Sequence, residues 1–223
     1  KLLFVTHSGG FIHSSVGLAE DVMKEIGPKH GYDVTCWRYT GDPADPKLDK
    51  YKEAFLKSTK KRIEPENMGR VNKDTLKNFD AVLFFTTGGG PKKGNLSPLT
   101  LDELKDLEAW VKDGGAFTGT HCASDTMYDT TYGELIGGYF KTHPHQQKVK
   151  LKLEDPKHPA AAGMTDGMDW TDEYYVMTDA PYSRDKLHII LSIDKATFDK
   201  GKNNNATRAD GDYAVSWCKE QGK

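Results

Sequence analysis

The feature that most constrains the fold is a series of short apolar segments separated by helical patterns. The segments are 2–6 (LLFVT), 32–39 (YDVTCWRY), 81–85 (AVLFF) and 116–120 (AFTGT). Continuous apolar runs of this length are typical of strands that are buried on both faces of a parallel sheet. Their regular alternation with helices predicts an α/β fold with a doubly wound, mostly parallel sheet.

Two helical patterns carry signals for their ends. A helix from Ser14 or Ser15 to about Ile26 is predicted, because serine can cap its start and Gly27-Pro28 can end it. Its apolar residues fall on one stripe, which comprises Leu18, Val22, Met23 and Ile26. The second helix is predicted to begin at a capping box and to end at a glycine pair; these are Thr100 with Glu103, and Gly114-Gly115.

Two regions depart from this alternation. Residues 41–78 are rich in Lys, Asp and Pro, and they are predicted to form a surface insertion or lid with a short amphipathic helix near 48–58. After residue 126 the alternation loosens, and the strands predicted there are 148–154, 172–177 and 186–193. The length fits one α/β domain better than two small ones, so a single domain over 1–223 is expected.

The charge balance and the hydropathy exclude two classes of partner. There are 31 Lys and Arg against 33 Asp and Glu, which gives a formal net charge of −2 and no basic footprint of nucleic-acid binding. The sequence has no run of 18 apolar residues, so no membrane span is expected. The expected partner is therefore a small molecule or another protein.

The cysteines and the first residues bear on the compartment. Cys36, Cys122 and Cys218 are too few and too far apart for a disulfide framework. The sequence begins on a strand without an initiator Met, as it would after removal of a leader. An exported or periplasmic location is therefore the favoured expectation, and a cytoplasmic one stays open.

Three loops that follow the strands are predicted to meet at one edge of the sheet. Ligands of open parallel sheets bind outside the carboxyl ends of the strands, near the point where the strand order reverses. The loops THSGGFIHSS, TTGGGP and GTHCASDT follow three such ends, which are neighbours in a flavodoxin-like order. Gly10 and Gly89 would let the backbone approach a ligand closely. The side chains expected around the shared crevice are His7, His13, His121 and Cys122.

These residue types suit several kinds of chemistry. Histidine suits acid–base catalysis near neutral pH and metal coordination equally, and a cysteine at such a turn suits nucleophilic attack. A histidine at a strand end can also be an ordinary hydrogen-bonding residue, and Cys122 can pack inertly behind the turn. Three histidines on loops that are predicted to meet favour a functional role.

Two later clusters add imidazole and carboxylate groups. In KTHPHQ, His143 and His145 lie two residues apart, so an extended backbone would aim both rings to one side. In WTDEYY, aromatic residues flank Asp172 and Glu173. Such flanking is typical of sugar-binding carboxylates and of acids with a raised pKa, but it also fits an ordinary strand with one polar face.

Taken together, five stretches resemble the ThuA-like (trehalose utilisation) domain in order and spacing over nearly the whole chain. They are THSGGFIHSS, GGAFTGTHCASDT, YGELIGGYFKTHPHQ, EDPKHPAAAGM and WTDEYYVM. The resemblance implies a flavodoxin-like three-layer sandwich similar to class I glutamine amidotransferases. It also implies a link to sugar metabolism, in which such proteins accompany the oxidation of disaccharides to 3-keto derivatives and their further processing.

The resemblance also implies roles at the turns. The amidotransferase fold carries a nucleophilic cysteine at its strand-to-helix elbow, whereas ThuA-like domains carry a histidine there, which corresponds to His121. The family pattern Gly-Phe-Arg-His in the first loop is Gly10-Phe11-Ile12-His13 in this chain. The family would continue past the final SWCKEQGK into a last strand, so residues beyond 223 are expected to complete the domain.

Three functional hypotheses follow. The first is an enzyme that hydrolyses or isomerises a glycoside or a 3-keto-disaccharide, with His121 and Glu173 as its acid–base pair. The second is a non-catalytic domain that binds carbohydrate or docks a partner, and the third is an amidohydrolase that uses Cys122. The substrate-binding residues of the first hypothesis are His7, Gly10, His13, Gly89, His143 and Asp172. Its candidate ligands for a divalent metal such as zinc are His7, His121 and Glu173. A homo-oligomer stays open.

Overall fold

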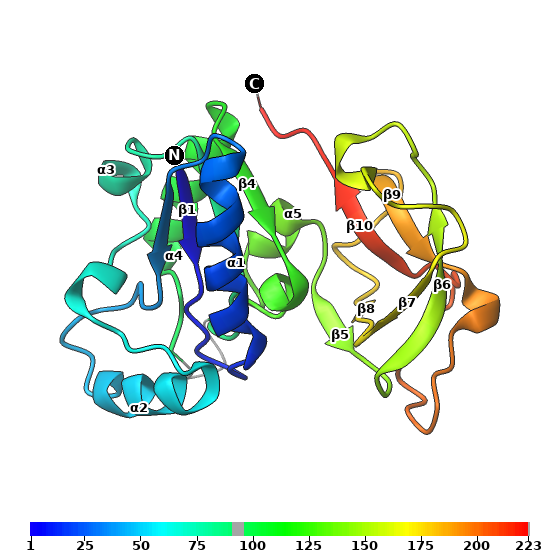
Figure 1. Cartoon of the computed structure of the whole chain (residues 1–223), viewed down its shortest axis with the longest axis horizontal. Coiled ribbons are helices and arrows are strands. Elements are labelled where there is room, and N and C mark those ends of the chain that lie inside the picture. Colours follow the sequence, from blue (N-terminus) through cyan, green and yellow to red (C-terminus); the bar gives the residue numbers. More distant parts are fainter. Residues whose placement is uncertain (91–95, 223) are drawn as a thin grey trace. The chain divides into compact units, whose positions relative to one another are not determined.

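The computed structural model describes residues 1–90 and 96–222. Figure 1 shows the path of the chain, which divides into two compact units. The first comprises Lys1–Ile136 with Gln221–Lys223, and the second comprises Gly137–Glu220. The second unit builds sheets of its own, and the single domain expected over 1–223 stays a prediction.

The first unit contains a four-stranded parallel sheet. Its strands are β1 (Leu2–Val5), β2 (Val34–Trp37), β3 (Ala81–Phe84) and β4 (Ala116–Gly119), in the order β2-β1-β3-β4. All four occur where the apolar runs predicted them, which confirms the parallel α/β sheet in this unit. The order reverses between β1 and β3, and open parallel sheets in general bind ligands near such a reversal.

Two long helices connect these strands. The helix α1 (Ser15–Lys29) joins β1 to β2 and α4 (Leu101–Lys112) joins β3 to β4. Because the two connections run in opposite directions across the sheet, right-handed crossovers place the helices on opposite faces (Figure 1). The predicted capping box of α4 is confirmed, since Thr100 N donates to Glu103 Oε2 at 2.8 Å and Glu103 N donates to Thr100 Oγ1 at 3.2 Å.

The predicted end of α1, at Gly27-Pro28, was wrong. The helix passes through Gly27 and Pro28 and ends at Lys29. Gly27 serves close packing there, because a Cβ on it would lie 2.5 Å from Val34 Cγ2. Pro28 sits in the last turn, where its missing N–H removes one helical hydrogen bond.

The apolar stripe of α1 faces away from the sheet. Leu18, Val22 and Ile26 are 66%, 42% and 40% exposed, whereas Glu20 is fully buried. The carboxylate of Glu20 accepts hydrogen bonds from Thr6 Oγ1 at 2.9 Å and from Arg38 Nη2 at 2.7 Å. A buried ion pair therefore takes the place that the amphipathic pattern assigned to apolar side chains.

The segment 41–78 is attached to the core. Its helix α2 (Leu48–Thr59) confirms the helix predicted near 48–58, and it buries Tyr51 and Phe55. Arg38 Nη1 donates to Asn67 Oδ1 at 2.9 Å and also to Arg62 O. Arg38, which is paired with Glu20, therefore also holds the part of the segment that follows α2. The expected surface insertion thus contributes side chains to the core. The short elements of the first unit are η1 (Pro65–Asn67), α3 (Lys73–Leu76), η2 (His121–Ser124) and α5 (Tyr132–Ile136).

The second unit is built mainly from antiparallel strands. Its larger sheet has the order β10-β9-β6-β7, and β5 pairs with β8. The elements are β5 (Phe140–Thr142), β6 (Gln147–Leu153), η3 (Pro159–Ala161), β7 (Asp169–Asp172), β8 (Val176–Met177), β9 (His188–Ile193), η4 (Lys195–Thr197) and β10 (Ala214–Cys218). The strand predicted over 172–177 is interrupted, because β7 ends at Asp172 and β8 begins at Val176.

No helix in the described ranges is long and apolar enough to cross a membrane.

A charge network ties the strands of the second unit together. Arg184 donates two hydrogen bonds to Glu154, at 2.7 and 2.9 Å, and two to Asp212, at 2.7 and 2.8 Å. Ser192 Oγ also donates to Glu154, at 2.5 Å. The hydrogen bonds from Arg184 lower the pKa of Glu154 from its ordinary 4.5 to about 2.

Replacing Arg184 is expected to change how stability depends on pH. A carboxyl group with a lowered pKa in the folded state stabilises the protein above its unfolded pKa, and this stability is lost as the pH falls. For Glu154 the loss should fall between about pH 4.5 and about pH 2. Urea denaturation of the wild type should therefore show a steeper fall in unfolding free energy across this range than Arg184→Ala shows. Lys152→Ala, which removes only a more distant positive charge, serves as the control. Equal slopes for the wild type and Arg184→Ala would contradict the assignment.

Candidate functional site

Three loops of the first unit continue the pairing of the sheet beyond its strands. Ser8 pairs with Thr87 and Gly88 pairs with Thr126, both in parallel orientation. Gly9 N donates to Thr87 O at 2.9 Å, and Gly88 N donates to Asp125 O at 2.7 Å. The predicted meeting of the loops after β1, β3 and β4 is confirmed for their described residues. Positions 91–95, which include Pro91 of the TTGGGP loop, lie outside those residues.

The glycines of these loops allow the loops to approach one another. A Cβ on Gly10 would lie 3.3 Å from Gly88 Cα, and a Cβ on Gly88 would lie 2.4 Å from Gly10 N. Gly88 has a φ of +83°, and Gly89 has a φ of +79° with Ser97 Oγ 2.4 Å from an added Cβ. Gly10 and Gly89 thus allow close packing within the first unit. Their expected role in giving a ligand access to the backbone stays a prediction.

His121 occupies a sharp turn between β4 and η2. Its φ is +47°, a left-handed conformation that is uncommon for residues other than glycine. Thr120 N donates to Phe84 O at 2.9 Å just before the turn, and Ala123 N donates to Thr120 O at 3.1 Å just after it. The turn thus holds the backbone on both sides of His121. Strained turns of this kind are found where a side chain must be presented at the end of a strand.

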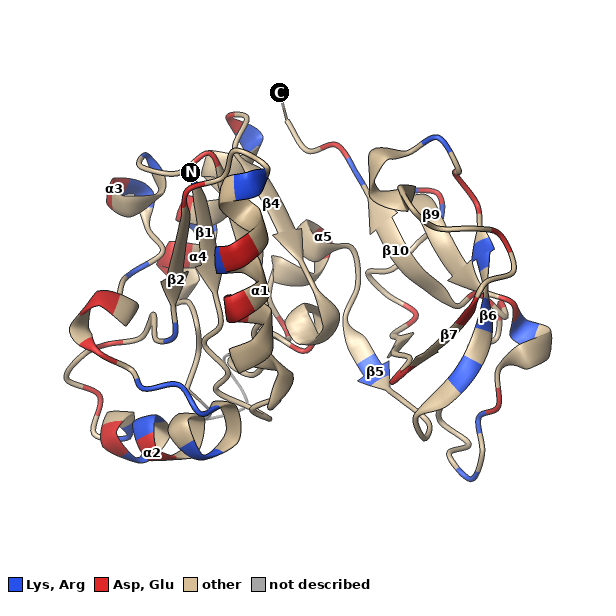
Figure 2. Ribbon diagram, viewed as in Figure 1, with Lys and Arg blue, Asp and Glu red and all other residues tan. Residues whose placement is uncertain are grey.

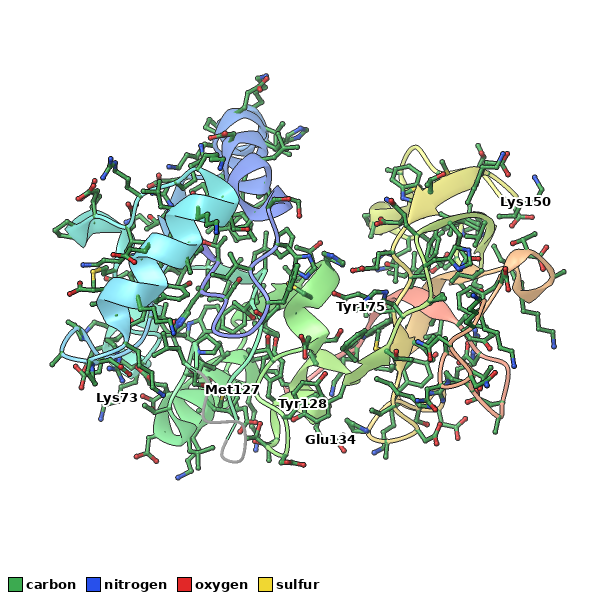
Figure 3. All side chains as sticks on the ribbon, turned by 90° about the horizontal axis from the view of Figure 1, so that it is seen from below. Lys73, Met127, Tyr128, Glu134, Lys150 and Tyr175 are labelled. Carbon is green, nitrogen blue, oxygen red and sulfur yellow. The ribbon has the colours of Figure 1, made fainter. Side chains whose placement is uncertain are left out.

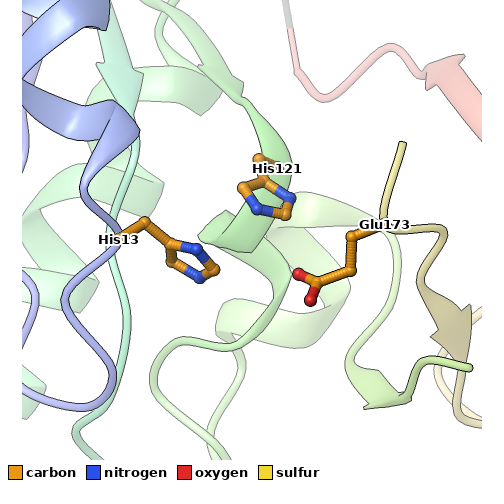
Figure 4. Close-up of side chains that lie close together, drawn as sticks. All are labelled: His13, His121 and Glu173. Carbon is orange, nitrogen blue, oxygen red and sulfur yellow. The ribbon is translucent and has the colours of Figure 1, made fainter. Parts of the chain in front are cut away.

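The ring of His13 lies next to the ring of His121. Their centroids are 4.5 Å apart with an edge-to-face angle of 61°, and a ring nitrogen of one lies within 4.8 Å of a ring nitrogen of the other (Figure 4). Phe85 lies beside both rings, 5.7 Å from that of His121 and 6.3 Å from that of His13. The ring of Phe11 is 4.8 Å from His13 and is 69% exposed. We call His13 and His121 the imidazole pair.

His7 is placed differently from its prediction. Its side chain is fully buried between Tyr39 and Tyr51, whose ring centroids are 4.9 and 5.0 Å from it. Its Nδ1 accepts from Thr40 N at 3.3 Å, so the proton of the neutral ring is on Nε2. Burial lowers the pKa of His7 to about 3. His7 is therefore a neutral core residue at physiological pH and does not line an open crevice.

Cys122 is also buried, with no exposed surface. It follows His121 within η2, and the turn directs it into the interior of the first unit. Of the two residues at the turn, His121 is the one that the solvent reaches.

The second unit brings together His143 and Glu173. His143 Nε2 lies 3.3 Å from Glu173 Oε1, and His143 Nδ1 donates to Pro144 O at 2.7 Å. Since a carbonyl oxygen only accepts, the Nδ1 of His143 is the donor in this contact, and its Nε2 faces the carboxylate of Glu173. The ring of Tyr175 stacks on His143 with centroids 5.9 Å apart. We call His143 and Glu173 the imidazole–carboxylate pair; Figure 4 labels Glu173.

Asp172 and His145 are the other two predicted residues of the second unit. Asp172 is exposed, and its Oδ1 accepts from Glu173 N at 2.8 Å. His145 lies beside Gly201, where an added Cβ would be 2.9 Å from its Nδ1. The predicted alignment of His143 and His145 is thus replaced by two different surroundings.

Sequence reasoning did not select Phe11, Phe85 or Pro144 as site residues. The apolar run at 81–85 marked Phe85 only as part of a strand. The sequence contained one signal for Phe11: it is a large apolar side chain in the glycine-rich loop that follows β1. The role of Pro144 depends on its carbonyl oxygen, which no side-chain pattern reveals.

The fold and the turn define a class: a mixed α/β protein with a histidine at the elbow after a parallel strand. The sequence profile of the ThuA family, described as trehalose utilisation, matches residues 1–223, so the chain belongs to the ThuA family. This confirms the resemblance and a role in carbohydrate metabolism.

Solved structures of similar fold carry related descriptions. One is a putative ThuA-like protein from Bacteroides uniformis ATCC 8492, with a TM-score of 0.66 and 16% identity, over 98% of this chain and 77% of that one. Another is a putative ThuA-like protein from Parabacteroides merdae ATCC 43184, with a TM-score of 0.60 and 16% identity, over 99% and 75% of the two chains. Among curated proteins, none matches the chain with significance.

The close approach of the loops can be tested with a matched pair of glycine variants. Gly88→Ala and Gly31→Ala both place a side chain at a φ near +80°, but only Gly88 has backbone atoms within 3 Å of the added Cβ. Both should lose about 1–2 kcal/mol of unfolding free energy through strain. Gly88→Ala should lose about 1–3 kcal/mol more through overpacking. Urea denaturation measures both losses, and equal values would contradict the role given to loop contact.

Proposed function

We propose that this protein is an enzyme that hydrolyses or isomerises a glycoside or a 3-keto-disaccharide, with His121 and Glu173 as its acid–base pair. The family assignment supports carbohydrate as the substrate class. The observation that carries the proposal is the imidazole pair, which lies at the ends of the parallel strands. The strained turn at His121 and the pairing between the three loops hold it there.

The imidazole pair suits proton transfer to and from sugar oxygens. Each neutral ring offers one N–H donor and one acceptor, so two rings in edge-to-face contact can bind a hydroxyl and remove or return its proton. Fixing His121 at the elbow limits how far its ring can move, which favours transfer over a short distance. A group of this kind contributes roughly 10²–10⁴-fold to the rate.

The aromatic residues suit the remaining surface of a sugar. The C–H groups of a pyranose present an apolar face, and exposed aromatic rings bury such faces well. Phe11 is 69% exposed beside His13, and we propose that it stacks against a sugar ring whose hydroxyls reach the imidazole pair. The role of His13 is then to bind substrate, as the sequence predicted.

We propose Glu173 as the second acid–base group for two reasons. Aromatic residues flank it in the sequence, and His143 lies beside its carboxylate. His143 Nε2 lies 3.3 Å from its carboxylate, so a second polar group stands beside it. Carboxyl groups are common acid–base catalysts at sites that act on sugars. We retain His143 and Asp172 as proposed substrate-binding residues beside it.

A divalent metal fits part of this donor set. Catalytic zinc takes three protein ligands and keeps one position open. His13 and His121 supply two imidazoles within 4.8 Å of each other, whereas buried His7 drops out as a candidate. We propose Glu173 as the third ligand, as its sequence context suggested. Zinc bound there would lower the pKa of a coordinated water.

We infer that the first unit has a flavodoxin-like arrangement. The order β2-β1-β3-β4 and the helices on both faces support this inference. The proposal that Cys122 is a nucleophile is not retained, because a side chain without exposed surface cannot attack a substrate. The binding-module hypothesis is an outcome of the experiment that follows.

Turnover can be screened with glycosides, disaccharides and their 3-keto forms. The variants His121→Ala and Glu173→Gln should each lower kcat/KM by about 10²–10⁴-fold, whereas Cys122→Ala should retain activity. His30→Ala, at the exposed end of α1, is the histidine control. Saccharide binding without turnover across the panel would support the binding module instead. Loss of activity in Cys122→Ala with an unchanged melting temperature would revive the thiol mechanism.

The metal proposal is tested by zinc titration calorimetry. Zinc should bind the wild type and His30→Ala with equal affinity, and His13→Ala and His121→Ala should each weaken binding by about 100-fold or more, since each removes a ligand. An equal loss in Glu173→Gln is expected if its carboxylate completes the site. Unchanged affinity in Glu173→Gln would restrict the metal to the first unit, and unchanged affinity in His121→Ala would rule the site out.

A further inference from the structure

The second unit contains a recess that none of the proposed catalytic residues line. Its volume is about 530 Å³, within the range of roughly 300–1,000 Å³ that is typical of small-molecule sites. The recess lies over β6 and β9 and is open to solvent, and residues around Gly167, Lys195 and Gly211 border it. Figure 3 shows Lys150, one of its lining residues, at the surface of the unit.

A clamped guanidinium belongs to the lining of this recess. Arg184 directs Nε and Nη2 to Asp212, and Nη1 and Nη2 to Glu154. Four of its five N–H groups are engaged in these bonds, and no other bond from Arg184 is found among the described residues, so one N–H on Nη1 can donate to a ligand. The side chain is 43% exposed, so a donor of fixed position faces the solvent. Preorganised donors of this kind lower the entropy cost of binding.

The charges of the recess balance. Its four cationic residues are Lys150, Lys152, Arg184 and Lys195, and its four acidic residues are Glu154, Asp166, Asp194 and Asp212. Figure 2 shows blue segments on β6 and red segments in loops of the second unit. A neutral site rich in both donors and acceptors disfavours an anion such as phosphate, which would need a net positive charge. It suits a neutral ligand that carries many hydroxyl groups.

One aromatic side chain completes the lining. Tyr213 is half-buried, and its ring lies 4.6 Å from that of Phe198, which fixes its position. An aromatic ring among polar groups gives the C–H face of a sugar a surface to pack on while its hydroxyls reach the charged groups.

We propose that this recess is a second saccharide-binding site, which binds without catalysis. None of the described residues that line the recess is a histidine. Arg184 holds the carboxylates of Glu154 and Asp212 in place, so we expect them to accept hydrogen bonds from hydroxyl groups without taking up their protons. The site would keep a carbohydrate chain or a second sugar molecule on the protein. This second site rests on the proposed function only in that sugars are chosen as the probes.

A matched pair of glycine variants tests this site. Gly167→Asn places a side chain in the recess at a φ of +75°, and Gly163→Asn places the same side chain at +80° outside it. An added Cβ meets nothing within 4 Å at either position, and asparagine tolerates this backbone conformation. The two variants should therefore have similar melting temperatures and differ only in access to the recess.

Binding is followed through the backbone amide signals in the NMR spectrum of the full chain. All variants also carry His121→Ala, which removes a ring of the imidazole pair and so keeps the two proposed sites distinguishable. Trehalose and maltose should shift the amide signals of Gly167 and Gly211, and Gly163→Asn should retain this response. Gly167→Asn should weaken binding by at least about tenfold. Lys195→Gln, on the exposed rim, should weaken it several-fold and replaces Gly167→Asn if that variant unfolds.

Two results would overturn the proposal. One is equal binding of both disaccharides by Gly167→Asn and Gly163→Asn. The other is a response of these amides to inorganic phosphate but to neither sugar, which would assign the recess to anions. A failure to find turnover in the activity screen would leave this binding result unaffected, so the two proposals can fail separately.

Discussion

The site of the first unit depends on backbone pairing that continues after the parallel strands end. Thr87 is the link: its carbonyl accepts from Gly9 N at 2.9 Å, and its hydroxyl donates to Phe11 O at 2.8 Å. Gly88, next to Thr87, is tied to Asp125 on the third loop. The loops that carry His13 and His121 are therefore held through their own main-chain atoms. Side-chain substitutions at the histidines should leave this frame intact.

Burial separates the histidines into different chemical types. His7 follows β1 directly and enters the interior between two tyrosines, where desolvation keeps it neutral. His13 lies six residues later, beyond the glycines, and stays near the solvent beside His121. The same residue type thus serves packing at one position and proposed chemistry at the other. The glycine-rich loop between them makes the difference, because it turns the chain back toward the third loop.

The sequence predicted what depends on local pattern. Apolar runs located all four parallel strands, and the capping box located the start of α4, since both signals act over a few residues. The end of α1 and its exposed stripe were not predicted, because they depend on Gly27 meeting Val34 and on Glu20 meeting Arg38 across the fold. The meeting of the loops followed from sheet topology. The choice of His13 over His7 as the partner of His121 did not, because it requires knowledge of side-chain burial.

The central claim is that the imidazole pair binds the substrate. The direct measurement is a titration of protein containing ¹⁵N-labelled histidine with a 3-keto-disaccharide or trehalose, followed through the ring nitrogen signals. The account predicts that the signals of His13 and His121 shift together at the same sugar concentration, while those of buried His7 stay unchanged. Shifts confined to other histidines, with those of His13 and His121 unaffected at saturation, would contradict it.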